Sequence, residues 1–129
     1  MRNGGNWTEA RFNSFVKSIL RGGSKRWPPK YEVLNEACVG QKVNVKTGRL
    51  AKHYKCASCG GEFPAKDVQV DHKNPIIDPT KGFESWDKVV DGMYCEKDNL
   101  QVLCIDPCHK DKTAAEKQQA KERRNDSKV

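Results

Sequence analysis

Two pairs of cysteines have the spacing of metal ligands. Cys56 and Cys59 are separated by two residues, Cys104 and Cys108 by three, and forty-four residues lie between the pairs. Two short turns that each present two thiolates can complete a tetrahedral zinc site with no open coordination position, and such sites are structural. We therefore predict that these four cysteines bind a structural Zn²⁺ ion.

Cys38 and Cys95 remain outside this set. We expect each to lie on a helix among apolar neighbours as a buried free thiol, with a disulfide between them as the alternative. The sequence has no run of eighteen apolar residues and no apolar segment near Met1, so we expect neither a membrane span nor a signal peptide. The expected location is the cytoplasm, where thiols stay reduced and CxxC-type spacing favours metal over disulfides.

An acid and a histidine lie between the cysteine pairs, and a second histidine follows the last cysteine. Apolar residues alternate over 68–70 before Asp71-His72, which predicts a short strand ending at these two side chains. On a helix, Cys108 and His109 would point about 100° apart, so His109 would face away from the zinc. The zinc would bring this helix alongside the end of the strand.

These three side chains have complementary chemistry. Asp71 and His109 could hold a hard divalent ion and leave positions for water and for phosphate oxygens. His72 titrates near neutrality, so its neutral ring could act as a general base towards water. In isolation, an Asp-His dipeptide is more often a turn cap beside a packed histidine, and that remains the alternative.

The positive charge of the chain is concentrated in its first half. The formal net charge is +7, and residues 1–55 carry +9 while residues 56–129 carry −2. A basic region on a nearly neutral body favours nucleic acid as a partner, although a merely basic, soluble surface is the alternative.

The residues 21–30 form a predicted loop that could contact DNA. Its cations could hold phosphates while the indole ring packs or stacks, and a solvated loop with a packed Trp is the alternative. The candidate DNA contacts in this loop are Arg21, Lys25, Arg26, Trp27 and Lys30.

Periodicity predicts helices around this loop. Asn6 or Thr8 can cap a first helix that ends at Gly22-Gly23. Its apolar positions follow a helical period and should face the core: Phe12, Phe15, Val16, Ile19 and Leu20. A second helix should begin at Pro28-Pro29, carry Cys38 on one face and close at Gly40. Residues 41–55 show no clear period and read as a basic connector.

The remaining elements surround the acid and the histidines. We expect a strand near residues 62–66, the strand ending at Asp71-His72, and a helix capped by Ser85 with its apolar face in the core. An extended segment should follow over residues 99–103, and a last helix over 108–124. These elements give an α+β fold.

Three segments together resemble the HNH endonucleases of the ββα-metal (His-Me finger) superfamily. They are Asp71-His72-Lys73-Asn74-Pro75, then Asn99-Leu100-Gln101-Val102-Leu103-Cys104, then Cys108-His109-Lys110-Asp111-Lys112-Thr113. The resemblance covers residues 56 to about 116. Residues 82–87, and Lys112-Thr113 with Glu116, are similar to small HNH proteins of tailed bacteriophages. Residues 1–50 carry a weaker likeness to such proteins.

The resemblance implies a ββα-metal core with a four-cysteine zinc site, preceded by N-terminal helices. It divides the chain into a basic, helical, DNA-contacting region, 1–50, and an HNH nuclease domain, 51–129. His72 would be the general base, and Asn99 would stabilise the loop of the motif and help to orient that base. Asp71 and His109 would bind the catalytic ion, Mg²⁺ or Mn²⁺ or a similar divalent cation.

The implied reaction is the hydrolysis of a phosphodiester bond in double-stranded DNA, as a nick or a double-strand break. Lys112 could approach the phosphate, although a solvated lysine is the alternative. A phage-encoded enzyme of this kind would act in the cytoplasm of the host cell. The sequence indicates no oligomeric state.

Two other functions remain as alternatives. A non-catalytic, zinc-stapled DNA-binding module would need neither a divalent ion nor His72, and the intact set of Asp71, His72 and His109 disfavours it. A regulatory partner of phage packaging or replication proteins is the weaker alternative.

Overall fold

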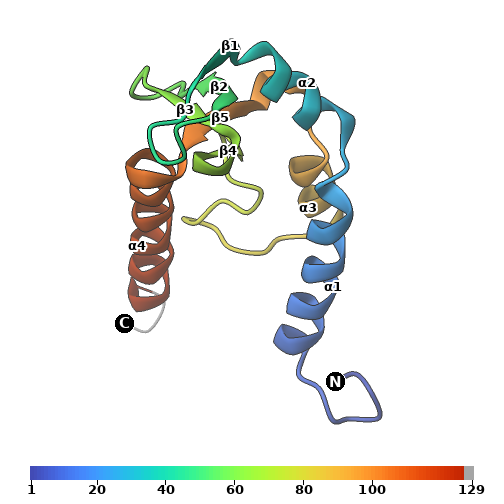
Figure 1. The fold of residues 1–129 in the computed structure, drawn as a ribbon. Helices are drawn as coiled ribbons and strands as arrows, with labels where there is room; N and C mark the ends of the chain where they lie inside the picture. The colour runs from blue at the N-terminus through green and yellow to red at the C-terminus, as the bar shows by residue number, and fades with distance from the viewer. Residues whose placement is uncertain (127–129) are drawn as a thin grey trace.

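Two small antiparallel sheets lie between helices from the two ends of the chain (Figure 1). The computed structural model describes residues 1–126. In chain order its elements are α1 (Glu9–Ser24), α2 (Pro28–Glu36), β1 (Cys38–Val43), β2 (Leu50–Lys55), β3 (Glu62–Pro64), η1 (Ala65–Asp67), β4 (Val68–His72), α3 (Trp86–Met93), η2 (Lys97–Asn99), β5 (Leu100–Cys104), η3 (Ile105–His109) and α4 (Lys110–Asp126). The α+β class is therefore confirmed.

One sheet has the order β1-β2-β3, and the other consists of β4 and β5. In Figure 1, α1 and α4 extend from the sheets on opposite sides of the molecule, and the chain after β4 passes between them. Within residues 1–126, no helix is both long and apolar enough to cross a membrane.

The strand pair β4–β5 forms the centre of the core. Val68 lies opposite Cys104 and His72 opposite Leu100, so the predicted strand ends at Asp71-His72 as expected. Val68, Leu100 and Val102 are buried against α2 and β2. Because β4 and β5 are held on this apolar face, the polar residues at the end of β4 have a fixed position.

The predicted helix starts are confirmed at two caps. The Thr8 hydroxyl accepts a hydrogen bond from the Arg11 amide at 3.1 Å, and the Ser85 hydroxyl accepts one from the Lys88 amide at 3.2 Å. The predicted end of α1 at Gly22-Gly23 is wrong, because the helix continues to Ser24.

Gly23 lies at a contact between α1 and the end of α3. A Cβ atom at Gly23 would lie 3.1 Å from the Tyr94 hydroxyl, and this hydroxyl donates to the Leu20 carbonyl at 2.7 Å. Glycine at position 23 thus allows the close approach of α1 to the end of α3.

The apolar face of α1 does not enter the core, contrary to the prediction. Phe15 is 49% exposed and Ile19 is 60% exposed. Trp7 packs edge-on against Phe15, with ring centroids 5.3 Å apart. Because the contacts of α1 with the body are made near its C-terminal end, at Leu20 and Gly23, the rest of its apolar face stays on the surface.

The segment predicted as a basic connector is a β-hairpin, and Cys38 begins its first strand rather than lying on a helix. Gly40, with φ of 104°, lies at an irregularity in the β1–β2 register, and the turn between the strands closes where the Asn44 amide donates to the Arg49 carbonyl at 2.8 Å. The strand β1 shows no alternation of apolar and polar residues, because both of its faces are largely exposed.

The predicted boundary at residue 50 falls in this hairpin, so both sides of it share one sheet. The division of the chain into regions 1–50 and 51–129 stays a prediction, and residues 127–129 lie outside the described part.

Substitution of Met93 tests the packing of α3. Its side chain is 1% exposed, so Met93→Ala should leave a cavity and lower the free energy of unfolding by about 2–5 kcal/mol. The control is Val90→Ala on the same helix, at a side chain that is 39% exposed, with a loss below about 1 kcal/mol. Urea denaturation with the metal content held constant measures both. Equal losses would contradict the burial of α3 on the core.

Candidate functional site

The four cysteines predicted from spacing form a cluster. One sulfur atom from each of Cys56, Cys59, Cys104 and Cys108 lies within 4.8 Å of every other. Cys56 and Cys104 are fully buried, whereas Cys59 is exposed and Cys108 is half-buried. Four thiolates at this separation could hold a metal ion such as Zn²⁺.

The backbone around the first pair is shaped for thiolates. The Cys59 amide points at the Cys56 sulfur at 3.5 Å, and the Gly61 amide points at the Cys59 sulfur at 3.4 Å. Gly60, with φ of 74°, provides the tight turn between them. The turn therefore offers N–H donors to sulfur before any ion is considered.

The thiols of Cys56 and Cys104 differ in pKa. Burial raises the pKa of Cys56, but hydrogen bonds from neighbouring backbone amides outweigh it and bring this pKa down to about 6. Burial raises the pKa of Cys104 to about 12. A cation that binds all four sulfurs must displace the proton of Cys104, so metal binding here is coupled to proton release.

The cluster joins two parts of the chain. Cys56 and Cys59 lie in the turn between β2 and β3, and the Ala57 amide donates to the Val102 carbonyl of β5 at 2.8 Å. Cys104 ends β5, and Cys108 lies in η3 just before α4. The cluster therefore connects the start of α4 to the turn between β2 and β3.

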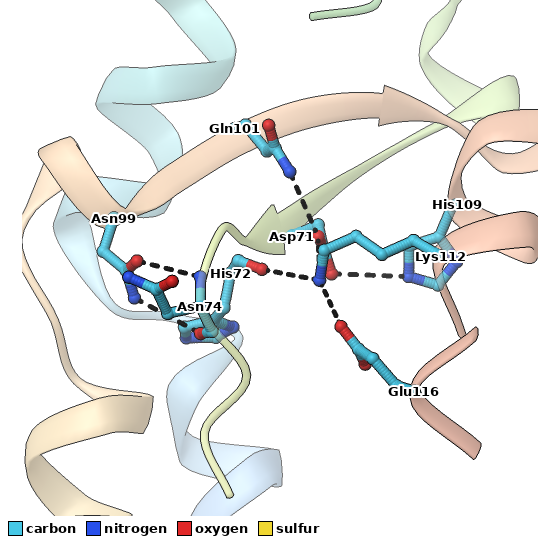
Figure 2. Close-up of polar contacts among 8 residues, drawn as sticks. All are labelled: Asp71, His72, Asn74, Asn99, Gln101, His109, Lys112 and Glu116. Carbon is cyan, nitrogen blue, oxygen red and sulfur yellow. Dashed lines mark hydrogen bonds and ion pairs between the residues drawn. The ribbon is translucent and has the colours of Figure 1, made fainter. Parts of the chain in front are cut away.

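Asp71 and His109 meet beside the cluster (Figure 2). The Nε2 atom of His109 lies 3.8 Å from Oδ1 of Asp71. Cys108 and His109 lie in the π-type turn η3 rather than in the regular helix that was predicted. Their side chains still separate, because Cys108 belongs to the sulfur cluster while His109 faces Asp71.

Lys112 of α4 binds the same carboxylate. Its Nζ lies 3.0 Å from Oδ2 of Asp71 and 2.9 Å from the His72 carbonyl, and it also pairs with Glu116 one turn further along α4 (Figure 2). Burial lowers the pKa of Lys112, but the two carboxylates outweigh this effect and raise it above its usual value. The group is therefore a stable ammonium.

Two residues of this site were not among the predicted site residues. The Gln101 amide nitrogen donates to Oδ2 of Asp71 at 3.4 Å, and Gln101 lies opposite Asp71 in the β4–β5 register. Glu116 is four residues from Lys112, a spacing that on a helix places two side chains side by side. The i,i+4 spacing could have identified Glu116, whereas Gln101 required the strand register.

The His72 ring has a defined hydrogen-bond partner. Its Nε2 lies 3.1 Å from the Met93 carbonyl, which can only accept, so Nε2 carries the proton and Nδ1 keeps its lone pair. Burial is the main cause that lowers the pKa of His72 below its ordinary value, and the charges of Lys30 and Lys112 act in the same direction. The ring is therefore neutral at pH 7.

Asn99 holds the chain that leaves β4. Its side-chain oxygen accepts from the Asn74 amide at 3.0 Å (Figure 2). Its backbone carbonyl accepts from the Lys73 amide at 2.7 Å. These contacts fix the two residues after His72. Asn99 thus lies next to the predicted base, while its catalytic role stays a prediction.

A cavity of about 220 Å³ lies beside Asp71 and His72. Arg21 of α1 reaches it from the N-terminal region, and Asp71, His72 and Lys112 line it from the other side. A larger cavity of about 800 Å³ lies between the β1–β2 hairpin and Ile105. The smaller cavity is the candidate site, because it holds the acid, the histidine and the cations together.

The other predicted DNA contacts lie in the loop after α1. Lys25 and Arg26 are exposed. Trp27 packs edge-on against Tyr94 with ring centroids 5.6 Å apart, and its indole N–H donates to the Cys95 carbonyl at 2.6 Å. Lys30 is half-buried, and its Nζ donates to the Ser24 hydroxyl at 3.2 Å.

Trp27 and Lys30 therefore anchor this loop to the body, which matches the alternative of a packed Trp. Contact of the loop with DNA stays a prediction.

No known protein family matches the chain, and no curated protein or solved structure is significantly similar to it. Any functional conclusion therefore depends on the chemistry of the site itself.

The sulfur cluster predicts about one tightly bound zinc per chain. Cys104→Ser should remove it, because a buried ligand is lost, whereas Cys38→Ser should retain it, since Cys38 lies outside the cluster. Elemental analysis of freshly purified protein measures the metal content. Absence of zinc from the wild-type protein, or full retention by Cys104→Ser, would refute the assignment.

Proposed function

We propose that this protein is a metal-dependent DNA endonuclease of the HNH type, which hydrolyses phosphodiester bonds in double-stranded DNA. The observation that carries the proposal is the grouping of Asp71, His72 and His109 beside a four-cysteine cluster. The order of two antiparallel strands followed by α4 agrees with the ββα-metal core that the sequence resemblance implies. In this proposal Zn²⁺ at the cysteines is structural.

The residues around Asp71 suit a hard divalent cation. The Lys112 ammonium already lies against Asp71, Glu116 and the His72 carbonyl, so this set of oxygens binds positive charge. Asp71 and His109 would hold the ion, with water and phosphate oxygens as further ligands. When bound, Mg²⁺ or Mn²⁺ would supply positive charge that stabilises the phosphoryl oxygens and the departing 3′ oxygen.

His72 is the general base of the proposed reaction. Because Nε2–H is engaged by the Met93 carbonyl, Nδ1 is free to take the proton of a water molecule. The lowered pKa of His72 keeps this nitrogen unprotonated at neutral pH. The attack of the water on phosphorus would leave 5′-phosphate and 3′-hydroxyl ends.

Asn99 is a positioning residue in this scheme. Asn99 accepts hydrogen bonds from the backbone amides of Lys73 and Asn74, the two residues that follow His72. These bonds would limit the movement of the base relative to the substrate.

Substrate binding is assigned to the cations around the cavity. Arg21 reaches the cavity from α1, and Lys25 and Arg26 extend positive charge beyond it on the exposed loop. Phosphate contacts of this kind bind DNA without reading its sequence. The enzyme would act in the cytoplasm, which is that of the host cell if the protein is phage-encoded.

A non-catalytic DNA-binding module stabilised by zinc is the second candidate, and the net charge of +9 on residues 1–55 favours it. It would need the cations and the cysteines, but neither a divalent ion nor His72. The same experiments separate the two functions.

The first experiment is a plasmid cleavage assay. Supercoiled plasmid is incubated with the protein and Mg²⁺ or Mn²⁺, and the cut ends are mapped. His72→Ala should lower the rate at least about a hundredfold, because the general base is lost. The matched control is His53→Gln, which changes a histidine on β2 outside the site and should retain cleavage and zinc.

Two results would refute the nuclease proposal: cleavage that persists in EDTA, and His72→Ala protein that cleaves at the wild-type rate. DNA binding without cleavage under any divalent ion would instead support the binding module.

The second experiment measures the salt dependence of DNA binding. Removal of residues 1–50 would also remove β1 and the packing of α2 on β5, so charge substitutions are preferable. The double variant Lys25→Ala, Arg26→Ala should reduce the slope of log K against log salt by about 2. Lys88→Ala on α3 is the control, and an unchanged slope in the double variant would exclude the loop from the DNA interface.

A further inference from the structure

Lys112 lies where a cation of the catalytic centre would be expected. Its ammonium contacts three oxygens from different parts of the site: Oδ2 of Asp71 at 3.0 Å, the carbonyl of His72 at 2.9 Å, and a carboxylate oxygen of Glu116 (Figure 2). The lysine side chain is 24% exposed, and that of Asp71 is 16% exposed. This is a shielded arrangement rather than a surface ion pair.

The arrangement has a clear electrostatic reason. Asp71 and Glu116 carry formal charges of −1 each around one nitrogen, and His109 next to Asp71 adds no fixed charge when neutral. Two partly buried carboxylates facing one point repel each other unless a cation lies between them. In the protein without a divalent ion, Lys112 supplies that cation.

A divalent ion and the Lys112 ammonium cannot both be well accommodated at Asp71. The ion would bind the same carboxylate that Lys112 occupies at 3.0 Å, and two cations on one carboxylate repel each other strongly in a shielded site. The divalent ion carries the larger charge, and it would also gain the imidazole of His109 as a ligand. The lysine, in contrast, has a flexible four-carbon stem and can move.

We propose that Lys112 holds the cation position of the catalytic centre until a divalent ion binds, and that the ion then displaces its ammonium into the cavity, where it binds the substrate phosphate. This inference rests on the proposed nuclease function, and it assigns Glu116 as the counter-charge that keeps Lys112 at the site. The displaced ammonium would face the cavity of about 220 Å³ that Arg21 also lines.

The displacement would couple ion binding to substrate binding. The charged side chains that line the cavity are Arg21, Asp71, Lys112 and Glu116, and their formal charges sum to 0. A divalent ion would change that sum to +2. A phosphodiester would therefore be attracted to the site more strongly after the ion has bound. Lys112 thereby gains a role in the order of binding as well as in the contact with DNA.

Metal affinity provides the first test, with a readout other than cleavage. Lys112→Met removes the competing ammonium and keeps the length of the side chain, so the affinity for Mn²⁺ should rise roughly tenfold, since no cation need be displaced. Isothermal titration calorimetry on zinc-loaded protein measures it. The control is Lys110→Met on the same helix, whose exposed Nζ lies 4.0 Å from Asp106, and its Mn²⁺ affinity should equal that of the wild type.

Thermal unfolding of the same proteins provides a second readout. Without Mn²⁺, Lys112→Met should have a lower melting temperature than Lys110→Met, because Asp71 and Glu116 lose their counter-charge. Saturating Mn²⁺ should remove this difference.

The outcomes separate this inference from the proposed function. Mn²⁺ binding that is lost in Asp71→Asn but unchanged or weakened in Lys112→Met would refute the displacement and leave the nuclease proposal standing. If the wild-type protein bound no Mn²⁺ at all, both would be refuted.

The wild-type protein offers a further test that needs no variant. Acetylation of lysines by an active ester, followed by peptide mass spectrometry, reports which amines are accessible. Addition of Mg²⁺ should speed the labelling of Lys112 several-fold relative to Lys110, because displacement exposes its amine. Equal labelling of Lys112 with and without Mg²⁺ would show that its ammonium does not move, and would refute the proposal.

Discussion

The meeting of the two cysteine pairs is the constraint on which the site depends. The first pair lies in the turn after β2, and the second connects the end of β5 to the start of α4. α4 is strongly polar along its length, with charged and amide side chains at most of its positions, so it has little apolar surface with which to dock. The cluster fixes the start of α4, and polar contacts hold the rest of the helix: Lys112 with Asp71, and Arg123 with the Pro79 carbonyl at 3.3 Å. For a chain with so small a core, a metal ion held by this cluster could replace the packing that a larger domain would supply.

The sequence allowed the reactive group to be predicted better than the frame around it. The strand ending at Asp71-His72 was predicted from alternation and is present, and the extended segment predicted over residues 99–103 corresponds to β5. The clustering of the four cysteines followed from spacing alone. These predictions succeeded because metal ligands and buried strands place strict demands on residue type at fixed intervals.

The failures have physical causes. The hairpin of β1 and β2 has cations and exposed apolar residues on its outer surface, among them Val43 and Leu50, so it shows no alternation to detect. α1 has a regular apolar face that predicts burial, yet Phe15 and Ile19 lie outside the core. Periodicity shows that a helix has an apolar face, but it does not show whether another element of the chain packs against that face. The contact of Lys112 with Asp71 is likewise a tertiary pairing between β4 and α4 that no local pattern encodes.

The last turn of α3 contacts two separate parts of the site through adjacent residues. The Met93 carbonyl holds the imidazole of His72, and the Tyr94 hydroxyl binds the carbonyl of Leu20, the residue before Arg21. The imidazole of His72 and the segment of α1 that carries Arg21 are therefore both held by hydrogen bonds to one short helix. The imidazole of His72 and the C-terminal part of α1 are thus both anchored by consecutive residues at the end of α3.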